Sequence, residues 1–164
     1  IENLLHLSRA DRAKLALTDQ DLSFLLLQLG EHYQPSIDQP LKLAIDPDIH
    51  VAGNAEMLQQ IVVALLDNAH KYSPHDQPIT LRLSQDDTNI NLAVADLGEG
   101  IPDDQKEAIF QRFYRVDQSR SQEIEGSGLG LAIVKQLVNL NQAQITVTNN
   151  QPKGSIFTVS WPKQ

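Results

Sequence analysis

Two hydrophobic periodicities alternate along the 164 residues of this chain, and their order limits the folds open to it. Between residues 58 and 69 the apolar side chains recur with the 3.6-residue period of an amphipathic helix. Asn54 can cap this helix, and Ser73-Pro74 ends it. A second helix with an apolar face is predicted over about 127–139.

Segments in which apolar and polar residues alternate flank these helices and predict strands. The turn at 86–89 joins two of them into a hairpin with one buried face. The predicted strands are 41–45, 79–84, 90–94, 145–147 and 157–161. With a further helix near the start of the chain, this order predicts an α/β (α+β) fold. We expect a two-layer sandwich with a mixed, mainly antiparallel sheet covered on one face by three helices.

The N-terminal residues divide the chain into two parts. Residues 1–17 carry a helical stripe of leucines and alanines that cannot complete a bundle alone, and we interpret them as the C-terminal tail and linker of a preceding helix. Thr18 with Asp21 resembles a capping box, which predicts a new helix from Thr18 to about Tyr33. The domain proper is therefore predicted to span 18–164.

Composition excludes several function classes. A net charge of −8 argues against a nucleic-acid-binding protein. The absence of cysteine removes disulfides and thiolate metal sites and is typical of a cytoplasmic protein. No window reaches the roughly 18 apolar residues of a membrane span, although a longer parent protein can still be membrane-anchored. The 41% of hydrophobic residues is enough for one core.

A glycine-rich turn, EGSGLGLAIVK, runs directly into the last predicted helix. Its glycines at 126, 128 and 130 leave backbone N–H groups free at a helix N-terminus, where the helix dipole favours an anion. The segment lacks the Gly-Lys-Ser/Thr of a P-loop, and its GxGxG spacing differs from GxGxxG. It therefore indicates either a phosphate site in some other nucleotide fold or close helix packing alone.

Asp96 breaks the pattern of the strand that precedes it. It continues the period-two series of residues 90, 92 and 94, so it is predicted to point to the buried side of the sheet. One interpretation places it at a pocket mouth, where it accepts a hydrogen bond from a ligand amino group while Gly98 and Gly100 let the backbone approach closely. The alternative is that the strand ends before Asp96 and the acid caps the following loop.

A polar stripe marks the end of the long helix. Asn68, Lys71 and Tyr72 lie at i, i+3 and i+4 on the edge of its apolar face. An amide oxygen is a suitable hard ligand for Mg²⁺, and Lys71 can meet a phosphate as a point charge. The alternative is a simple helix C-terminus, where Lys71 complements the dipole and Asn68 is solvated.

A polar connection of nearly thirty residues separates Gly98 from Gly126. Connections of more than about 12 to 15 residues are uncommon in compact domains unless they act as lids or binding loops. An apolar cluster of Ile109, Phe110 and Phe113 can anchor this one, and it predicts a lid over a polyphosphate. Its cations are Arg112, Arg115 and Arg120.

Five motifs in order resemble a known family. They resemble the N, G1, F, G2 and G3 boxes of the catalytic and ATP-binding domain of sensor histidine kinases. The five segments are LLDNAHKYSP (65–74), DLGEGIP (96–102), IFQRFYRVD (109–117), GSGLGLAIVK (126–135) and KGSIFTVSWP (153–162). The resemblance implies the ATP-binding α/β sandwich shared with gyrase-type topoisomerases, heat-shock chaperones and mismatch-repair ATPases.

The same resemblance implies ATP and Mg²⁺ as cofactors and a role for each matching residue. Asn68 would hold Mg²⁺, and Lys71 and Tyr72 would contact the phosphates and the ribose side. Asp96 would bind the adenine amino group, and Arg115 would approach the γ-phosphate, so that Asn68, Lys71 and Arg115 form the catalytic set. The other implied nucleotide contacts are Gly98, Gly100, Ile101, Tyr114, Gly126, Ser127, Gly128, Leu129, Gly130 and Leu131, of which Ile101 and Leu131 would line the adenine pocket.

The chain departs from the family pattern at Ala64. The family usually has Asn there, and its ATP-hydrolysing relatives have a Glu that activates water. Without a carboxylate at this position a dedicated ATPase is disfavoured. None of the five histidines matches a phosphoacceptor, His6 included, so the acceptor is expected on the parent's own dimerisation domain.

The predicted activity is that of an ATP-dependent protein histidine kinase in a two-component phosphorelay. The γ-phosphoryl of Mg·ATP would pass to a histidine of the dimerisation domain and then to an aspartate of a response regulator. The resemblance implies a homodimeric parent, and the fragment itself is expected to be monomeric. The alternatives are a degenerate nucleotide-sensing module without kinase activity, which Ala64 favours, and an ATPase of the same superfamily.

Overall fold

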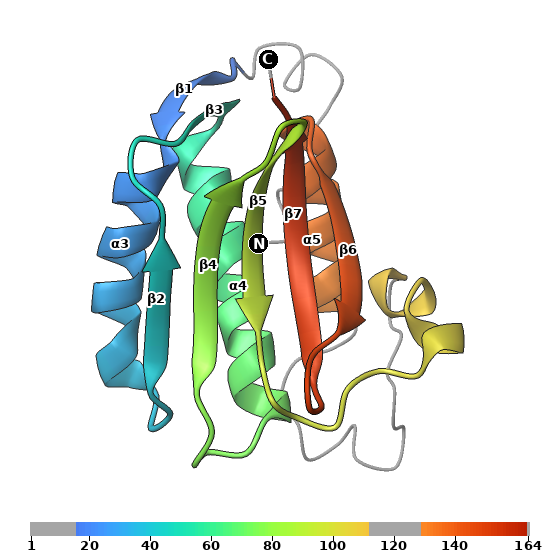
Figure 1. Ribbon diagram of the computed structural model, residues 1–164. Helices are drawn as coiled ribbons and strands as arrows, with labels where there is room; N and C mark the ends of the chain where they lie inside the picture. Colours follow the sequence, from blue (N-terminus) through green and yellow to red (C-terminus); the bar gives the residue numbers. More distant parts are fainter. Residues whose placement is uncertain (1–15, 112–128, 164) are drawn as a thin grey trace.

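The computed structural model describes residues 16–111 and 129–163, and its elements form two layers (Figure 1). One layer is a five-stranded sheet in the order β2-β4-β5-β7-β6, and α3, α4 and α5 cover one of its faces. The five strands are β2 (Leu41–Ile45), β4 (Ile79–Gln85), β5 (Asn89–Ala95), β6 (Gln144–Asn149) and β7 (Ser155–Pro162). The helices are α3 (Leu22–Tyr33), α4 (Ala55–Tyr72) and α5 (Leu129–Leu140). This arrangement confirms the predicted fold class.

Short elements complete the chain. Strands β1 (Thr18–Asp21) and β3 (His50–Gly53) form a separate two-stranded antiparallel sheet. Three 3-10 turns are η1 (Gln34–Ser36), η2 (Asp103–Gln105) and η3 (Ala108–Phe110).

The pairing of the large sheet explains why it is mixed. Strand β2 pairs with β4 in parallel, because α4 and β3 carry the chain back between them, while the other three pairs are antiparallel. The registers align one apolar residue from every strand into a row across the covered face. That row is Leu43, Leu81, Val94, Phe157 and Val147. The alternate apolar residues of the strands therefore form the sheet side of the hydrophobic core.

The helices pack their apolar faces against this row of sheet residues. On α4 every residue with the predicted 3.6-residue spacing from Leu58 to Ala69 is buried, and Asn54 Oδ1 caps the helix by accepting from Met57 N at 2.9 Å. On α5 the buried residues are Val134, Leu137 and Val138. At about 25 cal/mol per Å² of apolar surface, this burial is the main favourable contribution to folding.

The start of the domain differs from the prediction. Residues 18–21 form β1, so the predicted helix start at Thr18 is wrong, and α3 begins at Leu22. The physical reason is that Asp21 caps the helix through Phe24 N at 3.0 Å, while β3 holds β1 in an extended conformation. The tail predicted over 1–17 falls outside the described residues apart from Ala16 and Leu17.

Candidate functional site

Three parts of the chain that carry predicted site residues meet at one end of the sheet. The C-terminal end of α4, the end of β5 and the start of β7 lie together there, near η3 and the first turn of α5 (Figure 1). The topology thus brings the Asn68, Asp96 and Gly130 regions to one end of the molecule. Tyr114, Arg115, Gly126, Ser127 and Gly128 lie outside the described residues, as do Arg112, Phe113 and Arg120.

The last turns of α4 expose the predicted polar stripe. Asn68 is half-buried, Lys71 is exposed and Tyr72 is 51% exposed, whereas Ala69 between them is buried in the core. The burial of Ala69 fixes the rotation of the helix, so its neighbours must lie at the rim. An amide, an ammonium group and a phenol therefore lie at the surface at this end of the sheet.

Asp96 follows β5 directly and is only 4% exposed. Its backbone N–H still donates to Ser155 O at 2.9 Å, so the strand pairing with β7 continues through it. Its Oδ1 accepts from Gly98 N at 2.8 Å and from Ser155 N at 3.4 Å. The predicted burial of Asp96 is confirmed, and its side chain also caps the following loop, although the strand pairing does not end before it. Its role toward a ligand stays a prediction.

The environment of the Asp96 carboxyl group suits a hydrogen bond from a ligand to one of its oxygens, Oδ2. Burial raises the pKa of this carboxyl group, and the backbone hydrogen bonds from Gly98 and Ser155 offset part of the rise. In the described parts of the chain no group donates to Oδ2. A ligand amino group that donates to Oδ2 would compensate for the desolvation of the carboxylate.

Backbone-to-backbone packing holds the loop around Asp96. A Cβ on Gly98 would lie 2.1 Å from Tyr72 O, and one on Gly154 would lie 2.1 Å from Asp96 O. Gly154 also has φ +106°, which L side chains rarely adopt. The loop after β5 is therefore clamped between the end of α4 and the β6–β7 turn, and only glycine fits at either contact.

Apolar residues form the wall beside this loop. Ile101 and Leu131 are half-buried and pack against the core, while Ile109 is buried. The ring of Phe110 meets Phe157 edge to face at a centroid distance of 6.2 Å, so η3 is anchored on the sheet as the sequence predicts. Gly130 is exposed, and a Cβ there would meet nothing within 4 Å.

Three supporting residues were missed by the sequence analysis. Asn150 Nδ2 donates to Asp96 O at 2.8 Å, and Ser155 provides the backbone pairing described above. Lys106 Nζ donates to Ile101 O at 3.0 Å and pairs with Asp103, which lowers the pKa of that carboxyl group. Ser155 lies within the segment KGSIFTVSWP and Asn150 lies three residues before it, and this position was the available signal.

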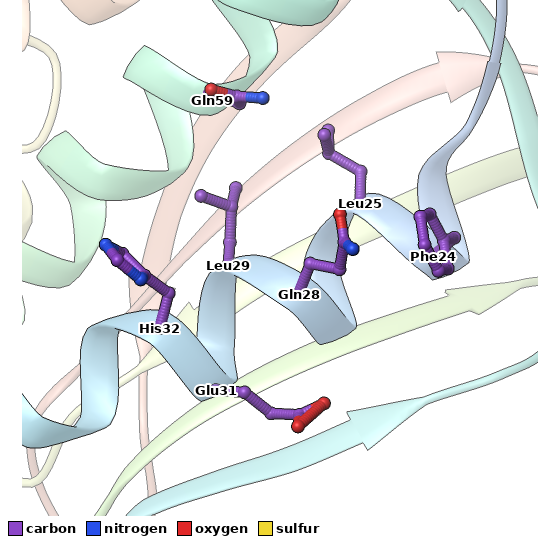
Figure 2. Close-up of a pocket in the computed structure, with 7 residues that line it drawn as sticks. All are labelled: Phe24, Leu25, Gln28, Leu29, Glu31, His32 and Gln59. Carbon is purple, nitrogen blue, oxygen red and sulfur yellow. The ribbon is translucent and has the colours of Figure 1, made fainter.

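Two of the hollows on the described part of the surface differ in their position relative to the candidate site. One runs between α3 and α4, lined by Phe24, Leu25, Gln28, Leu29, Glu31, His32 and Gln59 (Figure 2), and it contains none of the predicted site residues. The other borders the loop that follows Asp96 and is lined by residues 99–102 and 149–154. The second hollow is the one that adjoins the candidate site.

A divalent ion at this site would depend on few protein ligands. Among residues 16–111 and 129–163, no group of three or more His, Asp or Glu side chains is placed to hold a metal ion. The half-buried amide of Asn68 fits Mg²⁺, which usually binds through one or two protein oxygens together with waters and substrate phosphates. Such an ion would therefore bind together with a nucleotide rather than in a preformed cage.

Comparison with known proteins agrees with this geometry. Residues 53–164 match the family model described as histidine kinase-, DNA gyrase B- and HSP90-like ATPase. The sensor protein CiaH of Streptococcus pneumoniae is 36% identical over 160 residues, which cover 96% of this chain and 36% of CiaH.

Solved structures show the same fold. The mycobacterial sensor histidine kinase MprB superimposes with a TM-score of 0.76 and 30% identity over 89% of this chain and 97% of the MprB chain. Full-length ShkA in complex with AMPPNP gives a TM-score of 0.68 and 27% identity over 92% of this chain and 33% of ShkA.

The chain belongs to the histidine kinase-, DNA gyrase B- and HSP90-like ATPase family. Within that family it is a catalytic and ATP-binding domain of the sensor histidine kinase type. It spans 36% of the length of CiaH, so most of such a relative lies outside the compared region. In the described part of the chain, no helix combines the length and the apolar character needed to cross a membrane.

Proposed function

We propose that this domain binds Mg·ATP and transfers its γ-phosphoryl group to a histidine of a separate dimerisation domain, from which the group passes to a response regulator. The observation that carries the proposal is the buried Asp96 carboxylate, whose Oδ2 lacks a donor in the described residues, at the same end of the sheet as Asn68 and Lys71. A carboxylate oxygen that accepts from an exocyclic amine favours adenine over bases that present a carbonyl there.

The division of roles follows from the positions of the residues. Asp96, Gly98, Gly100, Ile101 and Leu131 form the base half of the site. Asn68, Lys71 and Tyr72, at the end of α4, form the phosphate half, to which we also assign Tyr114, Arg115 and the segment 126–130. When bound, Mg²⁺ neutralises the phosphate charge, and Asn68 would supply its protein oxygen.

The chain's own residues act by positioning rather than by covalent chemistry. Lys71 and Arg115 would place positive charge against the transferred group, and the glycines at 126, 128 and 130 would offer backbone N–H donors. Ala64 has no group that can deprotonate water, which favours transfer to an imidazole over hydrolysis. We also propose that residues 1–17 are the tail of the dimerisation helix and that the parent is a homodimer.

The proposal is tested with radiolabelled ATP and a longer piece of the parent that includes the preceding helices. We expect label that is stable in base and lost in acid, as phosphohistidine is. Steady phosphate release by the 164-residue chain alone would instead identify an ATPase. Binding of ATP without any label would favour the second candidate, a nucleotide-sensing module, for which Ala64 is the specific support.

A further inference from the structure

The buried side-chain amide of Gln39 contacts the end of α4, which carries the residues of the phosphate half of the site. Gln39, in the loop between η1 and β2, has a relative exposure of 0%. Its side chain reaches the last turn of α4: Nε2 donates to Ser73 Oγ at 2.9 Å, and Oε1 contacts His70 Nδ1. His70 lies two residues from both Asn68 and Tyr72 in the sequence, and Ser73 directly follows Tyr72.

The hydroxyl proton of Ser73 determines the directions of the hydrogen bonds in the cluster formed by Gln39, His70, Ser73 and Ala69 O. Ser73 Oγ donates its only proton to Ala69 O at 2.7 Å, so it accepts from Gln39 and cannot donate to it. The amide nitrogen of Gln39 must therefore face Ser73, and its oxygen must face His70. His70 then carries a proton on Nδ1. Each hydrogen bond of the cluster therefore has a defined donor and a defined acceptor.

The cluster also supplies the end of the helix with a cap. Ala69 O is one of the last carbonyl groups of α4, which have no partner within the helix. Ser73 satisfies it, and Gln39 orients Ser73. His70 is further held by His75, whose ring stacks on it at a centroid distance of 4.8 Å and an angle of 15°.

The loop that carries Gln39 is itself tied to the sheet, so it can act as a fixed support. Gln34 Nε2 donates to Gln39 O at 2.9 Å, and Gln34 Oε1 accepts from Leu41 N at 2.7 Å. Ile79 N donates to Pro40 O at 2.9 Å, which joins the loop to β4. Gln34 thus supports the backbone of the loop that carries Gln39.

We propose that Gln39 is a positioning residue that sets the last turn of α4 for the phosphates and metal ion of the nucleotide. The inference rests on the proposed function and deepens it. Asp96 is held independently of Gln39, by Gly98 N, Ser155 N and Asn150 Nδ2. Loss of the Gln39 amide should therefore weaken contacts to the triphosphate and spare those to the base.

The test compares two ligands in matched variants of the 164-residue chain. Gln39→Leu removes both side-chain hydrogen bonds to α4. Gln60→Leu, at an exposed position of α4 outside this cluster, is the control. Calorimetry measures the affinity for ATP with Mg²⁺, and ligand-observed NMR measures the affinity for adenosine. For Gln39→Leu we expect the ATP affinity to fall about fivefold or more while the adenosine affinity stays within about twofold.

Each outcome bears on the inference. For Gln60→Leu, both affinities are expected to stay within about twofold of wild type. Equal losses for ATP and adenosine in Gln39→Leu, or no loss for either, would overturn the positioning role. If Gln39→Leu does not fold, Ser73→Ala removes the cap with a smaller change and must show the same selective loss of ATP affinity. A wild-type chain that binds neither ligand would reject the proposed function itself.

Discussion

The buried carboxylate of Asp96 defines the candidate site at the scale of single residues. Its burial could be predicted from the period of residues 90, 92 and 94, because strand pairing continues through Asp96 N to Ser155 O. The hydrogen bond from Asn150 could not, because its donor lies 54 residues further along the chain and no local pattern records the contact. Local periodicity thus predicts the direction of a side chain but not its distant partners.

Replacing Asp96 by Asn should separate stability from binding. Burial raises the pKa of Asp96 in the folded protein above 3.8. At a pH between the pKa of the unfolded chain and the raised pKa of the folded protein, the folded protein holds a proton that the unfolded chain has released. The free energy of unfolding therefore falls as the pH rises through this range. Asp96→Asn removes that dependence, so urea denaturation at pH 7 should find it at least as stable as wild type. ATP affinity should fall about 30-fold or more, because Asn presents an N–H group to the adenine amine.

The control for this substitution is Asp87→Asn, in the exposed turn between β4 and β5. It should leave ATP affinity unchanged. Unchanged ATP affinity in Asp96→Asn would contradict the assignment of Asp96 to the base.

At the scale of elements, the segments with a clear hydrophobic period were predicted, and the four-residue strands β1 and β3 were not. Helix α4 and strands β4, β5 and β7 all lie where the hydrophobic pattern indicates. Strands β1 and β3 have four residues each and pair only with one another, so each depends on a partner about thirty residues away. The helix start was displaced for the same reason, since Leu22 N and Ser23 N donate to Ile49 O rather than to a residue of a preceding turn.

Replacing Gly98 and Gly130 by alanine should change the free energy of unfolding in opposite directions. Gly98→Ala places a Cβ 2.1 Å from Tyr72 O, and we expect it to lower the free energy of unfolding by about 2–3 kcal/mol. Gly130→Ala meets nothing within 4 Å on α5 and should raise it by up to about 1 kcal/mol through helix propensity. Urea denaturation of the two variants measures both effects.

The same pair of variants also examines the phosphate assignment. If a phosphate approaches the backbone at Gly130, the stabilised Gly130→Ala variant should bind ATP more weakly than wild type. A Gly98→Ala variant as stable as wild type would show that the contact with Tyr72 O yields easily.

At the scale of the whole molecule, an acidic chain with a net charge of −8 must bind a polyanion through local features. The fold brings the end of α4, which carries Lys71, and the first turn of α5 to one end of the sheet, where we propose that the phosphates bind. The sequence motifs predicted this convergence through family resemblance. The supporting contacts of Gln39 and Lys106 could not be predicted, because both residues lie outside the motifs.

Removal of the metal ion should affect only part of the binding. Saturating Mg·ATP at 100 times its dissociation constant should stabilise the chain by about 2.7 kcal/mol, measured as a rise in Tm. Excess EDTA should reduce that rise in the wild type. The Asn68→Ala variant should show the smaller rise whether or not EDTA is present, while Asn139→Ala, an exposed amide on α5, should behave as wild type.

The clamped loop around Asp96 also bears on the design of inhibitors. Gly98, Gly154 and Asn150 hold the base half of the site by contacts that involve neither nucleotide nor metal. A flat aminoheterocycle of fragment size that donates one N–H to Asp96 Oδ2 and packs on Ile101 should therefore find a preorganised surface. Its affinity should be insensitive to Mg²⁺, which would allow screening of compound libraries on the isolated domain without ATP.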